Sequence, residues 1–238
     1  MMAPIVLLNG GPAYDRKFES KSFVLNKTYA VALVAAGAVP IMPLEEDLID
    51  EYAELADGLV LSGAQSYTPR PDLAEDIETT GSSFRDRFDE KLYRAFYKLK
   101  KPILGICLGF QEINIFQGGD LENNFKFKEG KEHMMIPHAI KTEKGSVLNN
   151  LFGDSFIINS RHNRRINKLG AELKITATAD DGRVIEAIEH ESLPIIAFEW
   201  HPERMRSELP EAPEGPDMTP LFMYFVDLAK KAAAARKR

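Results

Sequence analysis

The chain has 238 residues, of which 44% are hydrophobic, 28% charged and 9% aromatic, as in a globular protein with a core of ordinary size. We expect residues 1–238 to form a single domain. Thirty basic and thirty-six acidic side chains give a formal net charge of −6, and no basic cluster is interleaved with aromatic residues, so the composition argues against a nucleic-acid partner and favours a small-molecule one.

The first half of the chain alternates apolar runs with amphipathic stretches. Expected strands cover residues 3–9, 38–44, 58–63 and 102–107, and expected helices cover 22–36, 48–56, 83–100 and 110–117. Buried strands separated by helices are typical of a three-layer α/β fold, with a mostly parallel central sheet and helices on both faces. We interpret NGGP at 9–12 as a turn that ends the first strand rather than as a phosphate-binding loop.

Two stretches with little periodicity interrupt this pattern, at residues 63–82 and 118–138. Both are predicted to be long loops, the first of them rich in Gly, Pro, Ser and Thr. Ligands of such sheets bind beyond the carboxyl ends of the strands, so we expect the two loops to cover that edge.

The second half of the chain contains alternating or β-branched runs broken by turn sequences. Expected strands cover residues 156–160, 172–180, 184–190 and 194–200, and a last helix covers 219–235. These strands predict antiparallel additions to the sheet. The basic tail, residues 230–238, is expected to be the frayed end of the last helix.

A single cysteine, Cys107, excludes an internal disulfide and favours the reducing cytoplasm as the location. The N-terminal stretch MMAPIVLLNGG has no basic residue ahead of its apolar run. That run is also too short for a signal peptide or a membrane span. We therefore expect a cytoplasmic protein with no membrane partner.

Cys107 lies in the sequence Gly105-Ile106-Cys107-Leu108-Gly109, where a predicted strand meets a predicted helix. At a sharp strand-to-helix turn, small residues two positions before and after a nucleophile avoid a collision across the turn. The N-terminus of a helix also favours the thiolate form of a cysteine. A lone cysteine after an apolar strand is commonly a packing residue, so this motif alone leaves both interpretations open.

A base for the thiol, and an acceptor to orient that base, stand in the stretch FEWHPE. His201 and Glu203 follow directly after a predicted strand, which Pro202 ends. A thiol nucleophile needs a base within hydrogen-bond distance and a group that orients the base. If strands 102–107 and 194–200 are parallel neighbours, the three side chains meet at one edge of the sheet.

The motifs GICLGFQ and WHPE resemble those of the class I glutamine amidotransferase-like superfamily, whose members use cysteine, histidine and glutamate in this chain order. Within it, the chain is most similar to the γ-glutamyl-γ-aminobutyrate hydrolase group. The resemblance extends from YAVALVAAGAVPIMP near the N-terminus to LFMYFV near the C-terminus. It implies a flavodoxin-like fold and a cysteine-dependent hydrolase that cleaves a γ-glutamyl amide bond through a thioester, releasing glutamate and an amine.

The resemblance also implies roles for individual residues. Cys107 would attack the γ-carbonyl group, His201 would take the thiol proton, and Glu203 would hold the imidazole. The backbone N–H groups expected to form the oxyanion hole are those of Leu108, Gly63 and Ala64. The residues expected to bind the substrate are Gln111, Ser160, Arg161 and His162.

The chain departs from the family pattern near these residues. The family usually has two consecutive glycines where this chain has Gly63 and Ala64, followed shortly by an aspartate where Ser66 stands. Glu199 stands where a glutamine often precedes the tryptophan. These differences leave open the second oxyanion donor and the identity of the leaving amine.

Three further predictions concern cofactors, partners and alternative functions. His133 and His138 are not spaced as a helical metal pair, and with no second cysteine we predict neither a metal site nor a cofactor. A glutaminase subunit that supplies ammonia to a partner synthetase stays open, as does a catalytically silent ligand-binding or regulatory module. The intact Cys107, His201 and Glu203 argue against the silent module. The sequence also leaves a homodimer open.

Overall fold

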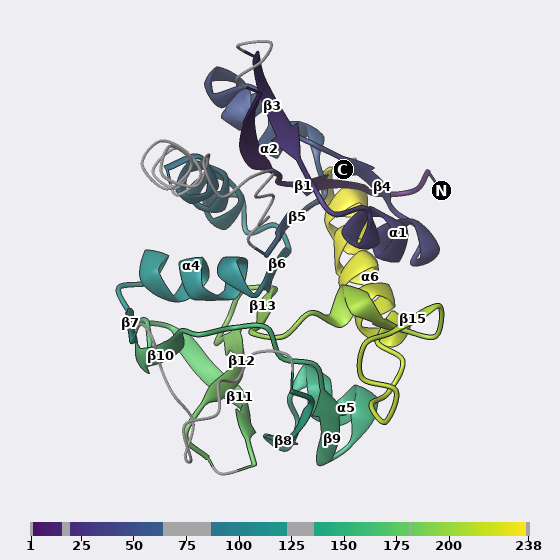
Figure 1. The fold of residues 1–238 in the computed structure, drawn as a ribbon. Helices are drawn as coiled ribbons and strands as arrows, with labels where there is room; N and C mark the ends of the chain where they lie inside the picture. The colour runs from purple at the N-terminus through teal and green to yellow at the C-terminus, as the bar shows by residue number, and fades with distance from the viewer. Residues whose placement is uncertain (1, 16–19, 64–86, 123–135, 181, 237–238) are drawn as a thin grey trace.

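The computed structural model describes residues 2–15, 20–63, 87–122, 136–180 and 182–236 (Figure 1). A nine-stranded sheet forms its centre. One half of this sheet is parallel and consists of β4 (Val39–Ile41), β1 (Ile5–Leu8), β5 (Gly58–Leu61), β6 (Ile103–Ile106) and β13 (Ile195–Phe198), in that order.

The other half of the sheet is antiparallel. It continues from β13 through β12 (Ile185–His190), β11 (Leu173–Ala179), β8 (His138–Thr142) and β9 (Ser155–Ile158). The predicted α/β fold with antiparallel additions in the second half is therefore confirmed.

Helices cover both faces of the sheet (Figure 1). One face packs against α1 (Lys27–Ala35), α5 (Val147–Phe152) and α6 (Thr219–Arg236); the other packs against α2 (Ile49–Leu55), a helix over residues 87–98, and α4 (Leu108–Phe116). Successive side chains of a strand point to opposite faces, so Val6 and Leu8 lie in one core and Leu7 lies in the other. Helix α6 contains most of the basic tail that we expected to fray.

The prediction of a helix over residues 22–36 is wrong at its start. Strand β3 (Ser20–Val24) pairs antiparallel with β2 (Gly11–Asp15), and this hairpin stands between β1 and α1. The side chain of Asn26 accepts a hydrogen bond of 3.0 Å from the N–H of Thr28. Asparagine is a strong N-cap, so the helix begins after it although apolar residues with helical spacing occur upstream.

Several short elements were not predicted. They are β7 (Asp120–Glu122), which pairs with β10 (Arg165–Lys168), strand β8, helix α5, the 3-10 helices η1 (Glu46–Leu48) and η4 (Pro202–Arg204), and the pair β14 (Met205–Arg206) and β15 (Leu209–Pro210). Strand β2 also begins inside the turn expected at 9–12, and β7 lies inside the loop expected at 118–138. Of the loop expected at 63–82, only Gly63 lies within the described residues.

The carboxyl ends of β5, β6 and β13 lie side by side. In the parallel pair β6 and β13, Ile106 is opposite Phe198, and the N–H of Cys107 donates to the carbonyl oxygen of Phe198 at 2.8 Å. The predicted parallel pairing of these strands is confirmed, and it brings two distant segments of the chain to one edge of the sheet.

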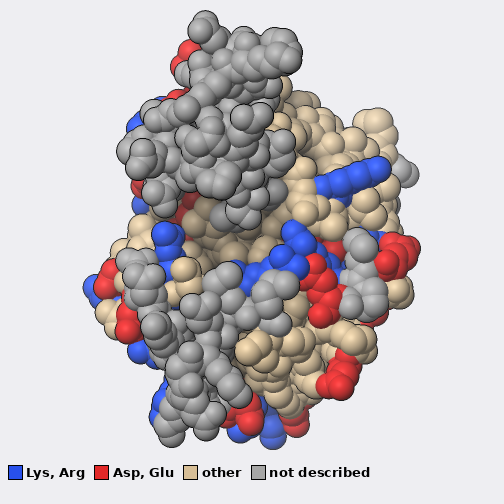
Figure 2. All heavy atoms as spheres, viewed as in Figure 1, with Lys and Arg blue, Asp and Glu red and all other residues tan. Residues whose placement is uncertain are grey.

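Among the helices of the described residues, none is both long enough and apolar enough to cross a bilayer. On the face shown in Figure 2, acidic and basic side chains of the described residues are interspersed.

Candidate active site

Cys107 lies at a strained strand-to-helix turn. It is the N-cap of α4, with φ of 52° and ψ of −103°, a region that residues other than glycine rarely adopt. A side chain at Gly109 would collide with the carbonyl group of Leu61, and one at Gly105 would lie 2.8 Å from the carbonyl oxygen of Gly109. The two glycines therefore let β5, β6 and α4 approach closely enough to form this turn.

His201 follows the end of β13 and lies beside Cys107. Cβ of Cys107 and Cε1 of His201 lie 3.4 and 2.9 Å from the one point that a Cβ atom at Gly63 would occupy, so the two side chains are neighbours. Asn159, which follows β9, fixes the backbone of His201 from both sides: its Oδ1 accepts the N–H of His201 at 2.9 Å, and its Nδ2 donates to the carbonyl oxygen at 3.0 Å. This pairing sets the position from which the imidazole projects.

Glu203 orients the imidazole from the first turn of η4. Its Oε1 lies 2.8 Å from Nδ1 of His201, and the side chain of Glu203 is fully buried. Arg204 donates to the same oxygen at 3.3 Å. With Nδ1 occupied by a carboxylate, Nε2 is the ring nitrogen left for the sulfur.

The electrostatics of this group favour a protonated imidazole. Burial by itself would lower the pKa of His201, but the carboxylate of Glu203 and the hydrogen bond to Cys107 outweigh it and raise the pKa to about 10. The site is therefore built to hold an imidazolium between a sulfur and a carboxylate.

The turn that follows β5 approaches the same site. A methyl group at the Cβ position of Gly63 would lie 3.4 Å from Cβ of Cys107 and 2.9 Å from Cε1 of His201. Before this glycine, the N–H of Ser62 donates to Oδ1 of Asn9 at 2.6 Å. Only glycine fits between the sulfur-bearing residue and the imidazole without moving one of them.

Tyr29, on α1, connects this turn to His201, and sequence reasoning did not identify it. Its hydroxyl accepts the N–H of Gly63 at 3.0 Å and lies 3.4 Å from Nδ1 of His201. Asn159 was likewise missed as a site residue. Both contacts join residues far apart in the sequence, so no local pattern signals them.

The residues predicted to form the oxyanion hole differ in how the structure places them. The N–H of Leu108 belongs to the first turn of α4 and has no acceptor within its helix. The N–H of Gly63 is engaged by the hydroxyl of Tyr29. Ala64 lies outside the described residues.

Two of the predicted substrate-binding residues lie in a buried polar group behind Cys107. Gln111 is on the first turn of α4, and its Nε2 donates to Oε1 of Glu199 at 2.7 Å. His162 is 4% exposed and lies 3.9 Å from the same oxygen. Both residues are thus near the site, but each already contacts a carboxylate.

Ser160 and Arg161 lie on another side of the site. Together with Pro137, Asn159 and Glu211 they line a cavity of about 90 Å³. The guanidinium of Arg161 forms two hydrogen bonds with Glu211, of 2.9 and 3.0 Å. The charge of Arg161 is therefore already paired with a carboxylate.

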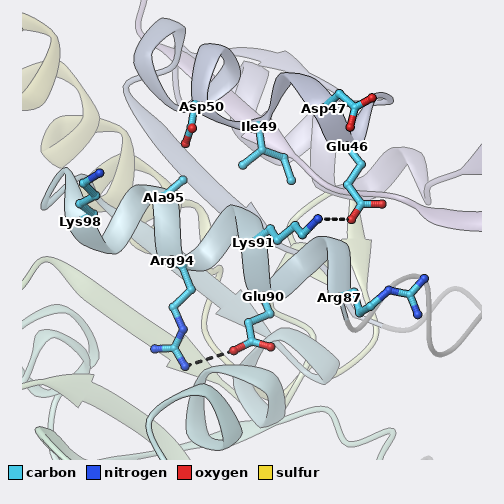
Figure 3. A pocket seen from close by; sticks show the side chains of 10 residues that line it. All are labelled: Glu46, Asp47, Ile49, Asp50, Arg87, Glu90, Lys91, Arg94, Ala95 and Lys98. Atoms are coloured by element: carbon cyan, nitrogen blue, oxygen red, sulfur yellow. Dashed lines mark hydrogen bonds and ion pairs between the residues drawn. The ribbon is translucent and has the colours of Figure 1, made fainter.

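A second, larger hollow lies elsewhere. A groove of about 700 Å³ runs between η1, α2 and the helix over residues 87–98, with the ion pairs Lys91–Glu46 and Arg94–Glu90 beside it (Figure 3). None of the candidate site residues lines it. Within the described part of the chain, no group of three or more His, Cys, Asp or Glu side chains is arranged to hold a metal ion.

The arrangement of a strained cysteine beside a carboxylate-bound histidine can be compared with known proteins. The family described as Peptidase C26 matches residues 13–203, a range that contains Cys107, His201 and Glu203. The chain belongs to the Peptidase C26 family. The predicted resemblance to class I glutamine amidotransferase-like proteins is thereby confirmed.

Individual relatives of this Peptidase C26 protein carry related names. A glutamine amidotransferase-like protein of Lactococcus lactis, YvdE, is 32% identical over 176 residues, which cover 69% of this chain and 74% of YvdE. The γ-glutamyl-γ-aminobutyrate hydrolase PuuD of Escherichia coli K12 is 27% identical over 205 residues, covering 77% and 80%. Both names agree with an enzyme of the hydrolase and glutamine amidotransferase type.

A solved structure shares the fold of this Peptidase C26 protein. The glutaminase domain of Trypanosoma brucei CTPS, solved with bound acivicin, superposes with a TM-score of 0.66 at 14% identity, covering 96% of this chain and 94% of that domain. This likeness confirms the predicted class of fold.

Proposed function

We propose that this Peptidase C26 protein is a cysteine-dependent hydrolase that cleaves the amide bond of a small γ-glutamyl compound. The observation that carries the proposal is the placement of His201 between Cys107 and Glu203: its ring lies beside Cys107 at the turn of Gly63, and its Nδ1 lies 2.8 Å from Oε1 of Glu203. The name of the relative PuuD, a γ-glutamyl-γ-aminobutyrate hydrolase, supports the substrate class.

In the first step, the thiolate of Cys107 attacks the γ-carbonyl carbon of the substrate. A C–S bond forms, and the π electrons of the carbonyl move to its oxygen. The N–H of Leu108 donates to this oxyanion. The N–H of Ala64 is the second predicted donor, since that of Gly63 is engaged by the hydroxyl of Tyr29. The imidazolium of His201 then gives its proton to the leaving nitrogen, the C–N bond breaks, and the amine departs.

In the second step, water hydrolyses the γ-glutamyl thioester. Neutral His201 takes a proton from the water as the oxygen attacks the thioester carbon, and the C–S bond breaks with the electron pair returning to sulfur. Glutamate is released and the thiolate–imidazolium pair is restored. Glu203 balances the charge of the imidazolium at the beginning and end of the cycle.

A panel of γ-glutamyl amides, glutamine included, tests this proposal through the release of glutamate. We expect release from at least one member by the wild-type protein and none by Cys107→Ala. Glu208→Gln, at an exposed carboxylate outside the site, is the matched control and should behave as wild type. If no compound is cleaved, the hydrolase proposal fails, and the catalytically silent binding module becomes the better description.

A glutaminase subunit that passes ammonia to a partner synthetase is the second candidate. The name of the relative YvdE, a glutamine amidotransferase-like protein, favours it. The same assay separates the two candidates, since a subunit of this kind would release glutamate from glutamine only after a partner synthetase is added.

A further inference from the structure

A second buried carboxylate lies next to the nucleophile and has no part in the mechanism described above. Glu199 follows directly after β13, two positions before His201, and is fully buried. Its Oε1 accepts the hydrogen bond of 2.7 Å from Nε2 of Gln111, on the first turn of α4. Glu199 therefore fixes the carboxamide of a side chain that lies one helical turn from Cys107.

Glu199 faces another buried carboxylate. Its N–H donates to the carbonyl oxygen of Glu186 on β12 at 2.9 Å, so the two glutamates are adjacent at the point where the antiparallel pair of β12 and β13 ends. Both are fully buried. Like charges placed next to each other across a strand pair are destabilising, and burial makes the repulsion stronger.

Histidines surround the pair but do not neutralise Glu199 directly. The ring of His162 lies between the two glutamates, with Nε2 3.7 Å from Glu186 and Nδ1 3.9 Å from Glu199. That Nδ1 is already hydrogen-bonded to the carbonyl oxygen of Arg164 at 2.8 Å. The nearer imidazole to Glu186 is that of His138, at 3.2 Å. Both imidazoles therefore lie closer to Glu186 than to Glu199.

One oxygen of Glu199 has no hydrogen-bond partner. Among the described residues, none lies within hydrogen-bond reach of its Oε2, which is inaccessible to solvent. An ionised carboxylate with an unsatisfied oxygen in the interior is far more costly than a neutral carboxylic acid.

We propose that Glu199 is a positioning residue that acts in its neutral, protonated form, holding the Gln111 carboxamide beside Cys107 without adding a negative charge next to the thiolate. This inference rests on the proposed function for its effect on catalysis. A neutral acid still accepts the N–H of Gln111 through its carbonyl oxygen, so the contact seen in the structure is retained. Ionisation of Glu199 would oppose the thiolate that the first step requires.

Burial and the neighbouring negative charges favour the neutral form of Glu199. Burial raises its pKa well above the ordinary value, the charges of Cys107 and Glu186 raise it further, and Gln111 and the guanidinium of Arg164 oppose them. An acid with a raised pKa stays neutral over a wider range and ionises as the pH rises. A negative charge on the sulfur of Cys107 thus disfavours a negative charge on Glu199, and the reverse also holds.

An infrared measurement tests the protonation state without any substrate. Difference spectra of wild type and Glu199→Gln near neutral pH should contain, from the wild type, the carbonyl stretching band of a protonated carboxylic acid. Only the carboxylate bands of Glu199 in that difference would overturn the inference, whether or not the protein cleaves any amide. Glu199→Gln should fold, because glutamine has the same shape and also accepts the hydrogen bond of Gln111.

The pH dependence of kcat/KM tests the effect on catalysis. In the wild type, kcat/KM should fall as Glu199 ionises, by about tenfold per pH unit above its pKa. The pH profile of Glu199→Gln should lack this fall and decline only as His201 loses its proton near pH 10. Glu199→Leu, which offers no acceptor to Gln111, should lower kcat/KM by roughly tenfold, mainly through KM. Wild-type and Glu199→Gln profiles of the same shape would overturn the inference while leaving the proposed function intact. No cleavage by the wild type would instead contradict the proposed function.

Discussion

At the scale of single residues, the proposed reaction depends on how Cys107 and His201 share a proton. The sulfur lies at the N-terminus of α4, and the imidazole lies between that sulfur and the buried carboxylate of Glu203. Glu203 and Cys107 both stabilise the imidazolium that lies between them. The three residues are therefore expected to respond as a unit when any of them is changed.

Removal of the charge of Glu203 tests this coupling. Glu203→Gln keeps the shape of the side chain but removes the charge that stabilises the imidazolium. We expect kcat/KM for a cleaved γ-glutamyl amide to fall by roughly 10²–10⁴-fold, as for the loss of a general acid–base group. Glu208→Gln is the control at an exposed glutamate. Similar kinetics for the two variants would show that Glu203 does not support His201.

The raised pKa of His201 predicts how stability depends on pH. The folded protein holds this proton up to about pH 10, whereas the unfolded chain loses it near 6.5. The resulting contribution to the free energy of unfolding is fully present below 6.5 and is lost as the pH rises towards 10. Urea denaturation across this interval should show that decrease in the wild type and a smaller one in His201→Gln. An equal decrease in both would mean that His201 is not protonated in the folded state.

The sequence motifs pointed to Cys107 and His201 as candidate residues. They did not point to residues whose contacts with these two join distant parts of the chain. Cys107 and His201 stand in recognisable local patterns. The hydroxyl of Tyr29 reaches His201 across 172 positions, and Asn159 reaches it across 42. Arg161 illustrates the opposite problem, because its partner Glu211 lies 50 positions away and could not be inferred.

At the scale of elements, the turn between β6 and α4 depends on the close approach of β5. The carbonyl carbon of Leu61 lies 2.7 Å from the position that a Cβ atom at Gly109 would occupy. No flexible side-chain end can move to relieve this contact, since the contacting atoms are the carbonyl group and the Cβ atom of Leu61. The glycines in the motif are thus explained by packing between neighbouring strands and the helix.

Gly109→Ala tests this explanation. The added methyl group should lower the free energy of unfolding by about 1–3 kcal/mol, as for other overpacked sites, and should displace Cys107. Ile115→Ala, at an exposed position of the same helix, is the control. Chemical denaturation gives the free energies. A Gly109→Ala protein as stable and as reactive at Cys107 as the wild type would contradict the packing argument.

Helices and strands could be predicted from the sequence where a stretch matched the pattern of only one of the two. Buried strands such as β5 and β6 have continuous apolar sequences, and the long helix before β6 has clear periodicity. The start of α1 could not be predicted, because apolar residues with helical spacing continue upstream of the capping residue Asn26 into strand β3. The pair of β7 with β10 was missed because each is only three or four residues long and its pairing spans distant segments.

At the scale of the whole molecule, the sheet determines where the site forms. Strand β13 enters the parallel half next to β6, although it is far from β6 in the sequence and its other neighbour, β12, is antiparallel. The position where the two halves meet therefore places Cys107 and His201 at adjacent strand ends. The order of the strands could not be deduced from the sequence pattern. From the sequence, the meeting of Cys107 and His201 was expected only if β6 and β13 were parallel neighbours.

The central claim is that Cys107 forms a γ-glutamyl thioester during turnover, and intact-protein mass spectrometry of a rapidly quenched reaction tests it most directly. The chain contains one cysteine, so an adduct that is released by hydroxylamine can be assigned to Cys107 without ambiguity. We predict a mass increase of one γ-glutamyl group in the wild type, enriched in variants with slow hydrolysis, and none in Cys107→Ala. Glutamate release at the wild-type rate by Cys107→Ala, with no adduct on the wild-type protein, would contradict the account.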